Sequence, residues 1–291
     1  MKIGLGTVQF GLDYGISNQG GRTSEAEVAK ILALAGTLGI TVIDTASLYG
    51  ESEKALGCAL PKRHPFKVVT KTIRFDKNKV TADDALLLER AFRESLSKLR
   101  CNSVYGLLFH NANDLLADGG GLLYDTLLSL KVSGAVEKIG VSVYTAQQLD
   151  EVIARYRIDL VQLPLNVLDQ RLFLSGHLAA LKRAGIEVHV RSSFLQGLLL
   201  MDPERLTPHF YSVRQHLFEY NDFLRAKGLT RLQGALGFVC GLGEVDSVVC
   251  GVNDHLQLEE ICCNCRPLPS SMFSRFGLTD PAILDPSKWV L

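Results

Sequence analysis

The 291-residue sequence predicts an α/β fold in which eight parallel strands close into a single (β/α)8 TIM barrel. Two observations predict this fold. Short β-branched or apolar runs recur eight times along the chain, and amphipathic stretches lie between them. No shift in composition and no linker rich in Pro, Gly or Ser divides the chain, so we expect one domain over residues 1–291. The expected strands are residues 2–6, 40–43, 67–70, 104–109, 138–141, 160–163, 187–190 and 245–250.

The stretches between these strands carry helix signals. Residues 24–38 repeat apolar side chains with a period near 3.6, and Ser24 with Glu27 has the spacing of a capping box. Residues 82–99 place Asp83 in the first turn and basic side chains at the end, which suits the helix dipole. By the same criteria the other expected helices are residues 121–133, 145–156, 170–184, 209–227 and 230–241.

A doubly wound open sheet is the alternative arrangement of alternating strands and helices. It requires a glycine-rich dinucleotide-binding turn after an early strand, followed directly by a helix. Gly4 and Gly6 lack the third glycine of that pattern, and residues 7–20 show no helical periodicity. We therefore expect the closed barrel.

Composition argues against several classes of protein. Lys plus Arg and Asp plus Glu both number 31, so the formal net charge is zero and no nucleic-acid partner is expected. No apolar run approaches the roughly 18 residues of a membrane span, and no signal-type apolar core follows Met1. We expect a cytoplasmic protein without a membrane partner, either a monomer or a weak homo-oligomer.

The seven cysteines are expected to be reduced thiols, because the count is odd and the chain is large. Cys262, Cys263 and Cys265 lie close together, but no second cluster of Cys or His stands at the spacing of a zinc site. We therefore predict no metal. Cys58 is expected to be a buried thiol on a helix.

Residues 265–291 are longer than an ordinary loop. They combine prolines with aromatic side chains, including the only tryptophan, Trp289, and show no helical period. We expect a C-terminal flap that covers the substrate. A terminal arm packed for stability is the alternative.

Titratable side chains follow three of the expected strands. Asp44 and Tyr49 follow the second strand, Lys71 the third and His110 the fourth. Active sites of such barrels lie at the carboxyl ends of the strands, so we expect these four side chains on one rim.

These four side chains are suited to carbonyl chemistry. An ammonium beside a phenol lowers the phenol pKa from its usual value near 10, and a carboxylate can keep that ammonium charged. An imidazole can orient a carbonyl oxygen or support proton transfer. The set suits protonation of a carbonyl oxygen while hydride reaches the carbon, and the hydride requires a nicotinamide cofactor.

The sequence resembles the aldo-keto reductase family. Residues 44–53 read DTASLYGESE and agree with every fixed position of the family signature D-T-A-x-x-Y-G-x-S-E. The opening Gly-Leu-Gly-Thr, a later Gly11, Lys71 after Val-Val-Thr, and His110 in Leu-Leu-Phe-His match in order and spacing. The resemblance covers roughly residues 2–261.

This resemblance implies a barrel that reduces a small carbonyl compound, an aldehyde or ketone, with NADPH or NADH. Tyr49 would be the general acid, Lys71 would lower its pKa, Asp44 would anchor Lys71, and His110 would position the carbonyl. The substrate pocket would be lined by Val8, Phe10, Leu48, Asn111 and Phe194. Candidate cofactor-binding residues are Gly6, Thr7, Ser142, Gln162, Arg191, Ser192, Phe194, Gln196, Gly197, Gly251, Asn253, Gln257 and Glu260.

Four positions depart from the family pattern, and one of them is Ile261, which replaces the terminal asparagine. Val143 replaces an asparagine, which removes one expected hydrogen bond to the nicotinamide carboxamide. Asn253 replaces the arginine that commonly binds the 2′-phosphate. Asp254 beside it would repel a phosphate, although a protonated His255 would compensate in part. We still expect NADP(H) to be slightly preferred over NAD(H).

Arg191 is the fourth departure, because it stands where the family usually has an aromatic that stacks on nicotinamide. A guanidinium plane can also stack, but its charge disfavours the oxidised, cationic ring. We therefore expect a bias toward carbonyl reduction. Two alternatives are that Arg191 binds an anionic substrate or pairs with a nearby carboxylate.

Two other functions are compatible with parts of the pattern. A lysine on a barrel strand also suits a lyase in which Lys71 forms a Schiff base. A barrel that senses the cofactor without turnover is the second alternative.

Overall fold

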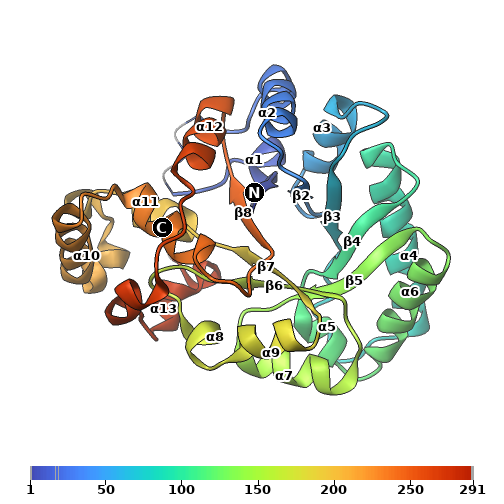
Figure 1. The fold of residues 1–291 in the computed structure, drawn as a ribbon. Helices are drawn as coiled ribbons and strands as arrows, with labels where there is room; N and C mark the ends of the chain where they lie inside the picture. Colours follow the sequence, from blue (N-terminus) through green and yellow to red (C-terminus); the bar gives the residue numbers. More distant parts are fainter. Residues whose placement is uncertain (1, 17, 19, 290–291) are drawn as a thin grey trace.

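The computed structural model describes residues 2–16, 18 and 20–289 and confirms the predicted (β/α)8 barrel. Eight parallel strands pair in sequence order, and β1 pairs with both β2 and β8, which closes the ring (Figure 1). The strands are β1(Ile3–Gly6), β2(Val42–Asp44), β3(Lys67–Lys71), β4(Val104–Phe109), β5(Val136–Ser142), β6(Leu160–Pro164), β7(Glu187–Arg191) and β8(Ser247–Gly251).

Helices surround this ring on the outside (Figure 1). The longer ones are α2(Glu25–Thr37), α4(Ala82–Leu99), α6(Gly121–Val132), α7(Ala146–Arg155), α10(Arg214–Ala226), α11(Arg231–Cys240) and α12(His255–Asn264). The shorter ones are α1(Val8–Gly11), α3(Ser52–Ala59), α5(Ala112–Leu116), α8(Arg171–Leu174), α9(His177–Arg183) and α13(Pro281–Leu284).

Two differences from the expected helices have local causes. The single helix expected over residues 170–184 is divided into α8 and α9, because Gly176 between them has a left-handed φ of 81°. The segment 7–20, expected to lack a helix, contains α1, whose four residues are too short to show a periodic pattern.

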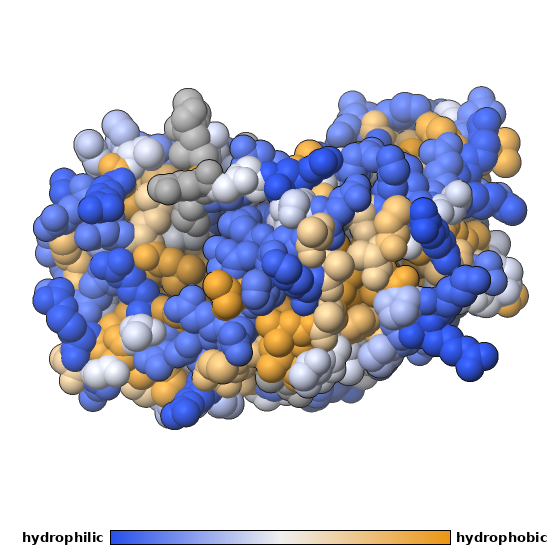
Figure 2. All heavy atoms as spheres, turned by 90° about the horizontal axis from the view of Figure 1, so that it is seen from above, coloured by the Kyte–Doolittle hydropathy of each residue, from blue (hydrophilic) through white to orange (hydrophobic). Residues whose placement is uncertain are grey.

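Apolar side chains form two buried clusters. The large one lies between the strands and the helices, and a small one consists of Val42, Val69, Tyr105, Leu108 and Leu160 from β2, β3, β4 and β6. Figure 2 shows hydrophilic side chains over much of the face seen from above, with smaller apolar areas between them. None of the described helices has the length and apolarity needed to cross a lipid bilayer.

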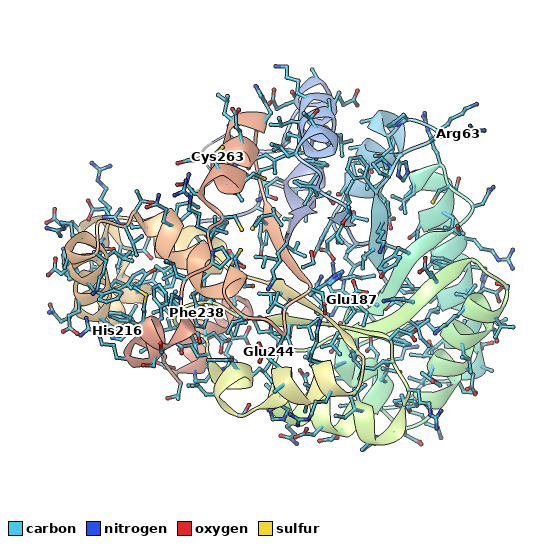
Figure 3. All side chains as sticks on the ribbon, viewed as in Figure 1. Arg63, Glu187, His216, Phe238, Glu244 and Cys263 are labelled. Carbon is cyan, nitrogen blue, oxygen red and sulfur yellow. The ribbon has the colours of Figure 1, made fainter. Side chains whose placement is uncertain are left out.

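A polar cluster lies at the amino-terminal ends of β4 and β7. Glu187, labelled in Figure 3, accepts hydrogen bonds from Tyr105 Oη at 2.6 Å and from the fully buried His189 at 2.7 Å, and it pairs with Lys138. These partners hold the pKa of Glu187 well below its usual range, although burial opposes the shift. The charged groups of this cluster therefore pair with one another, at the end of the barrel opposite the carboxyl ends of the strands.

The C-terminal segment packs as an arm against helices. Phe273 lies 5.8 Å from Phe238 of α11, and Phe276 lies 5.1 Å from Tyr220 of α10, measured between ring centroids. Figure 3 shows Phe238 on the side of the molecule where α10, α11 and α13 gather. This aromatic packing is what a stabilising arm requires, and a role of the segment in covering the substrate stays a prediction.

The described cysteines form no group that could hold a metal ion. Cys58 is exposed on α3, contrary to the expected buried thiol, because its side chain lies on the solvent face of that helix. Cys240 and Cys265 bring their sulfur atoms to 2.7 Å where α11 and α12 end.

Candidate active site

A groove of about 840 Å³ lies at the carboxyl ends of the strands. Asp44, Tyr49, Lys71 and His110 all line it. So do the thirteen predicted cofactor-binding residues, together with Val8 from the predicted substrate pocket. The closed barrel thus brings side chains from distant parts of the sequence to one rim.

A buried ion pair forms the base of this groove. Lys71 Nζ lies 2.8 Å from Asp44 Oδ1 and 2.7 Å from Oδ2, and it also donates to the carbonyl of Thr45 at 2.9 Å. Burial lowers the pKa of Lys71, but the Asp44 carboxylate and Tyr49 together outweigh burial and leave the pKa above its usual value. Lys71 is therefore a fixed positive charge.

Tyr49 lies directly above this pair. Its phenol oxygen is 3.4 Å from Lys71 Nζ. Burial raises the pKa of Tyr49, and the opposing effect of Lys71 does not reverse the shift, so the group is a neutral phenol in this structure. Gly11 supports its backbone: a Cβ at Gly11 would lie 1.8 Å from the carbonyl oxygen of Tyr49, so only glycine permits this approach.

The rings of His110 and Tyr49 form a T-shaped pair. Their ring centroids are 5.8 Å apart and the planes cross at 84°. Burial, assisted by Lys71 and two arginines, lowers the pKa of His110 to about 3, so the imidazole is neutral near pH 7. Its Nδ1 atom is buried and has no hydrogen-bond partner in the described part of the protein.

Gln162 joins the ion pair to the rest of the groove. Its Nε2 donates to Asp44 Oδ1 at 2.7 Å, while its buried Oε1 has no partner among the described residues. Asn253 Oδ1, also lining the groove, is likewise buried without a described partner. Unpaired buried acceptors fit a ligand that brings N–H or O–H donors, as a nicotinamide carboxamide and a ribose do.

The loop after β7 has an unusual backbone. Ser192, Leu195 and Gln196 have left-handed φ values of 61°, 48° and 53°. Such conformations cost free energy in residues other than glycine and often occur at functional sites. The amide of Ile16 donates to Gln196 O at 3.2 Å, so the segment after α1 reaches across to this loop.

Arg191 at the end of β7 turns toward Tyr144. Its guanidinium carbon lies 4.0 Å from the Tyr144 ring centroid, and one nitrogen donates to Val143 O at 3.2 Å. It forms no ion pair within the described ranges of the chain, so the salt-bridge alternative is not observed.

Three residues expected in the substrate pocket lie outside the groove. Phe10 is 1% exposed and belongs to the hydrophobic core, because α1 turns it inward. Leu48 is exposed on the turn before Tyr49 but does not line the groove. Asn111 caps α5, accepting from Asn113 N at 3.1 Å and donating to Asp76 at 2.8 Å, so its polar atoms are used.

Sequence reasoning missed several groove residues, including Tyr14, Asn18, Tyr144 and Arg231. Tyr144 follows the predicted Ser142 by two residues, so its place at a strand end was a usable signal. Tyr14 and Asn18 lie on a loop without periodicity. Arg231 begins a helix whose packing against α12 the sequence alone does not show.

The structure changes two expectations about the part of the groove that Asn253, Gln257 and Glu260 line. Asp254 caps α12, accepting from Gln257 N at 2.8 Å, and His255 pairs with Glu27 of α2. Both side chains are thus held by partners within the protein, and neither lines the groove.

The fold and site define a (β/α)8 barrel protein with a tyrosine, lysine, aspartate and histidine cluster at the carboxyl ends of its strands. The chain belongs to the aldo/keto reductase family, whose family model matches residues 2–277.

Two curated relatives match part of the chain. An aldo-keto reductase of Mycolicibacterium vanbaalenii is 34% identical over 140 residues, 46% of this chain and 46% of that protein. An uncharacterized oxidoreductase of Mycobacterium bovis is 30% identical over 147 residues, 50% of this chain and 42% of that protein. The chain thus matches slightly less than half the length of these relatives.

Solved structures agree over almost the full length. The holo form of an aldo-keto reductase from Bacillus halodurans has a TM-score of 0.75 at 18% identity, covering 99% of this chain and 95% of that one. A glycerol dehydrogenase from Gluconobacter oxydans has a TM-score of 0.72 at 19% identity, covering 94% and 90%. At these identities the likeness concerns the fold.

Proposed function

We propose that this protein is an oxidoreductase that reduces an aldehyde or ketone to an alcohol with a reduced nicotinamide cofactor. The observation that carries the proposal is the contact chain from Asp44 through Lys71 to Tyr49, with the neutral His110 beside it in one groove. The cofactor would supply the hydride. Its carboxamide would meet Gln162 and Ser142, and its far end would lie near Asn253, Gln257 and Glu260.

The side chains then have separate tasks. Tyr49 Oη donates its proton to the carbonyl oxygen as the carbon accepts hydride, which leaves an alcohol and a phenolate. Lys71 stabilises that phenolate by its charge, and Asp44 keeps Lys71 in position. His110, being neutral, donates a hydrogen bond to the carbonyl oxygen without competing as an acid.

We propose a preference for NADP(H) over NAD(H). Arg231 supports it, because this arginine lines the groove and its described hydrogen bonds go to Leu200 O and Asn221 Oδ1 rather than to a carboxylate. An arginine with free donors suits a phosphate. We further propose cytoplasmic action on small carbonyl compounds by a monomer or weak homo-oligomer, without nucleic-acid or membrane partners.

A Schiff-base lyase is less well supported. An attacking amine must be neutral, whereas both oxygens of Asp44 contact Lys71 Nζ and keep it charged. A cofactor sensor without turnover would bind the nicotinamide but would not need an aligned proton donor.

The decisive experiment compares wild type with Tyr49→Phe. NADPH and NADH binding are titrated by nicotinamide fluorescence, and aldehyde reduction is measured in parallel. We expect retained binding and a loss of kcat by about 10²–10⁴-fold, because the phenol proton is removed. Tyr211→Phe, an exposed tyrosine, is the matched control.

Other outcomes separate the alternatives. Binding without turnover in the wild type would identify a sensor. Absence of nicotinamide binding, with borohydride trapping of a carbonyl compound on Lys71, would identify a lyase.

A further inference from the structure

Arg191 is a half-buried cation whose donors are only partly used. One terminal nitrogen donates to Val143 O at 3.2 Å, and the other lies 3.5 Å from Ser192 Oγ. A guanidinium has five N–H donors, and these two contacts leave most of them without a partner among the described residues of a side chain that lines the groove. The stack on Tyr144 fixes the plane of the group, which reduces the entropy lost when an anion binds.

The groups that surround Arg191 leave its charge uncompensated. Asp44 is already paired with Lys71, and the neutral His110 and the phenol of Tyr49 carry no charge at pH 7. Tyr14 approaches from the loop after α1, and burial raises its pKa to about 12, so it too is neutral there. The catalytic end of the groove therefore has a net positive charge beside a proton donor.

A carbonyl compound with its own anionic group would match this arrangement. Its carbonyl oxygen would accept a hydrogen bond from Tyr49, and its anionic group would pair with the Arg191 guanidinium. The Tyr14 phenol would be a further donor to the anionic group. Pairing a partly desolvated guanidinium with an oxyanion is favourable, and bidentate contact with a carboxylate or phosphate adds geometric selectivity.

We propose that Arg191 is the anion-recognition residue of the substrate pocket and that the natural substrates are carbonyl compounds bearing a carboxylate or a phosphate. This inference rests on the proposed function and names the substrate class of the same site. It differs from a stacking role toward nicotinamide, because the guanidinium already lies on Tyr144.

The test uses matched substrate pairs. The three positional isomers of carboxybenzaldehyde are compared with their methyl esters, and glyceraldehyde 3-phosphate is compared with glyceraldehyde. The two pairs distinguish a carboxylate from a phosphate preference. The enzymes are wild type, Arg191→Gln, Arg191→Lys and the control Arg225→Gln, which removes an exposed arginine that pairs with Asp222 and does not line the groove.

We expect wild type to favour one anionic set by about 10- to 100-fold in kcat/KM, the range typical of a hydrogen bond to a charged group. Arg191→Gln should abolish this preference through KM, and Arg191→Lys should retain part of it. Arg225→Gln should behave as wild type. The affinity for NADPH, measured by fluorescence, should stay within about threefold of wild type in each variant, since the proposed contact is with the substrate.

Three results would overturn the inference. The first is equal use of neutral and anionic aldehydes by the wild type, which would leave the proposed reductase intact. The second is a loss of NADPH affinity in Arg191→Gln with unchanged substrate preference, which would assign Arg191 to the cofactor.

The third applies if no aldehyde is reduced, so that the proposed function fails. Calorimetry with 4-carboxybenzyl alcohol and NADP⁺ then tests the anion site alone. Binding by wild type but not by Arg191→Gln would support the site, and no binding by wild type would overturn it.

Discussion

Lys71 Nζ contacts both carboxylate oxygens of Asp44, at 2.8 and 2.7 Å, and the two side chains are only 1% and 5% exposed. Removing one partner of such a pair leaves an uncompensated buried charge. We expect Asp44→Asn to lower the free energy of unfolding by about 3–5 kcal/mol in urea denaturation.

Two comparisons check this interpretation. Asp44→Asn combined with Lys71→Met should recover part of the loss, because neither charge then remains. Asp222→Asn, which removes an exposed partner of Arg225, should cost no more than about 1 kcal/mol. The argument would be contradicted if the double variant lost more free energy of unfolding than Asp44→Asn and Lys71→Met lose in total as single variants.

His110 should give the protein a pH-dependent stability. The unfolded chain binds a proton on this imidazole near pH 6.5, whereas the folded protein binds it only near pH 3. The contribution of His110 to the free energy of unfolding is therefore fully present above about pH 6.5. It declines as the pH falls toward 3, by up to about 1.4 kcal/mol per pH unit.

Urea denaturation of wild type and His110→Gln between pH 4 and 8 measures this effect. We expect the difference in stability between the two proteins to be constant above pH 7 and to shift in favour of the variant as the pH falls. A difference that does not change across the whole range would contradict a depressed His110 pKa.

The C-terminal arm should matter for stability rather than for catalysis. Phe273 is fully buried against Phe238 and Phe223, so Phe273→Ala should cost about 3–5 kcal/mol of unfolding free energy. None of the described residues 265–289 lines the groove, so KM for aldehydes should not change below the melting temperature. Leu256→Ala, at an exposed position, is the control. A raised KM in Phe273→Ala would support the flap interpretation.

Cofactor preference should depend on the far end of the groove. We expect Arg231→Gln to weaken NADPH binding by about tenfold more than NADH binding, since only NADPH carries the 2′-phosphate. Asn253→Arg should raise the preference for NADPH. Arg225→Gln, an exposed position on α10, is the control for both. An equal loss for the two cofactors in Arg231→Gln would indicate that its contacts with Leu200 and Asn221 are only structural.

Much of the barrel could be predicted from local sequence. Each strand is a short apolar run, and its neighbour in the ring is its neighbour in the chain, so the order of elements already determines the pairing. The positions of Asp44, Lys71 and His110 followed from the same rule, because polar side chains that end parallel strands meet at one rim.

Helix breaks, short helices and the path of the arm could not be predicted in this way. The division at Gly176 depends on one backbone torsion, and four-residue helices such as α1 carry no periodic pattern. The aromatic residues of the arm were visible, but their partners on α10 and α11 lie far away in the sequence.

The fold, the family signature around Tyr49 and the residue types at the rim can be predicted from the amino-acid sequence, because they depend on local pattern and chain order. Tertiary structure alone decided that Phe10 faces the core, that Asp254 caps a helix and that Arg191 lies on Tyr144 without a described carboxylate partner. The physical reason is that direction, burial and charge pairing depend on neighbours brought together only when the barrel closes.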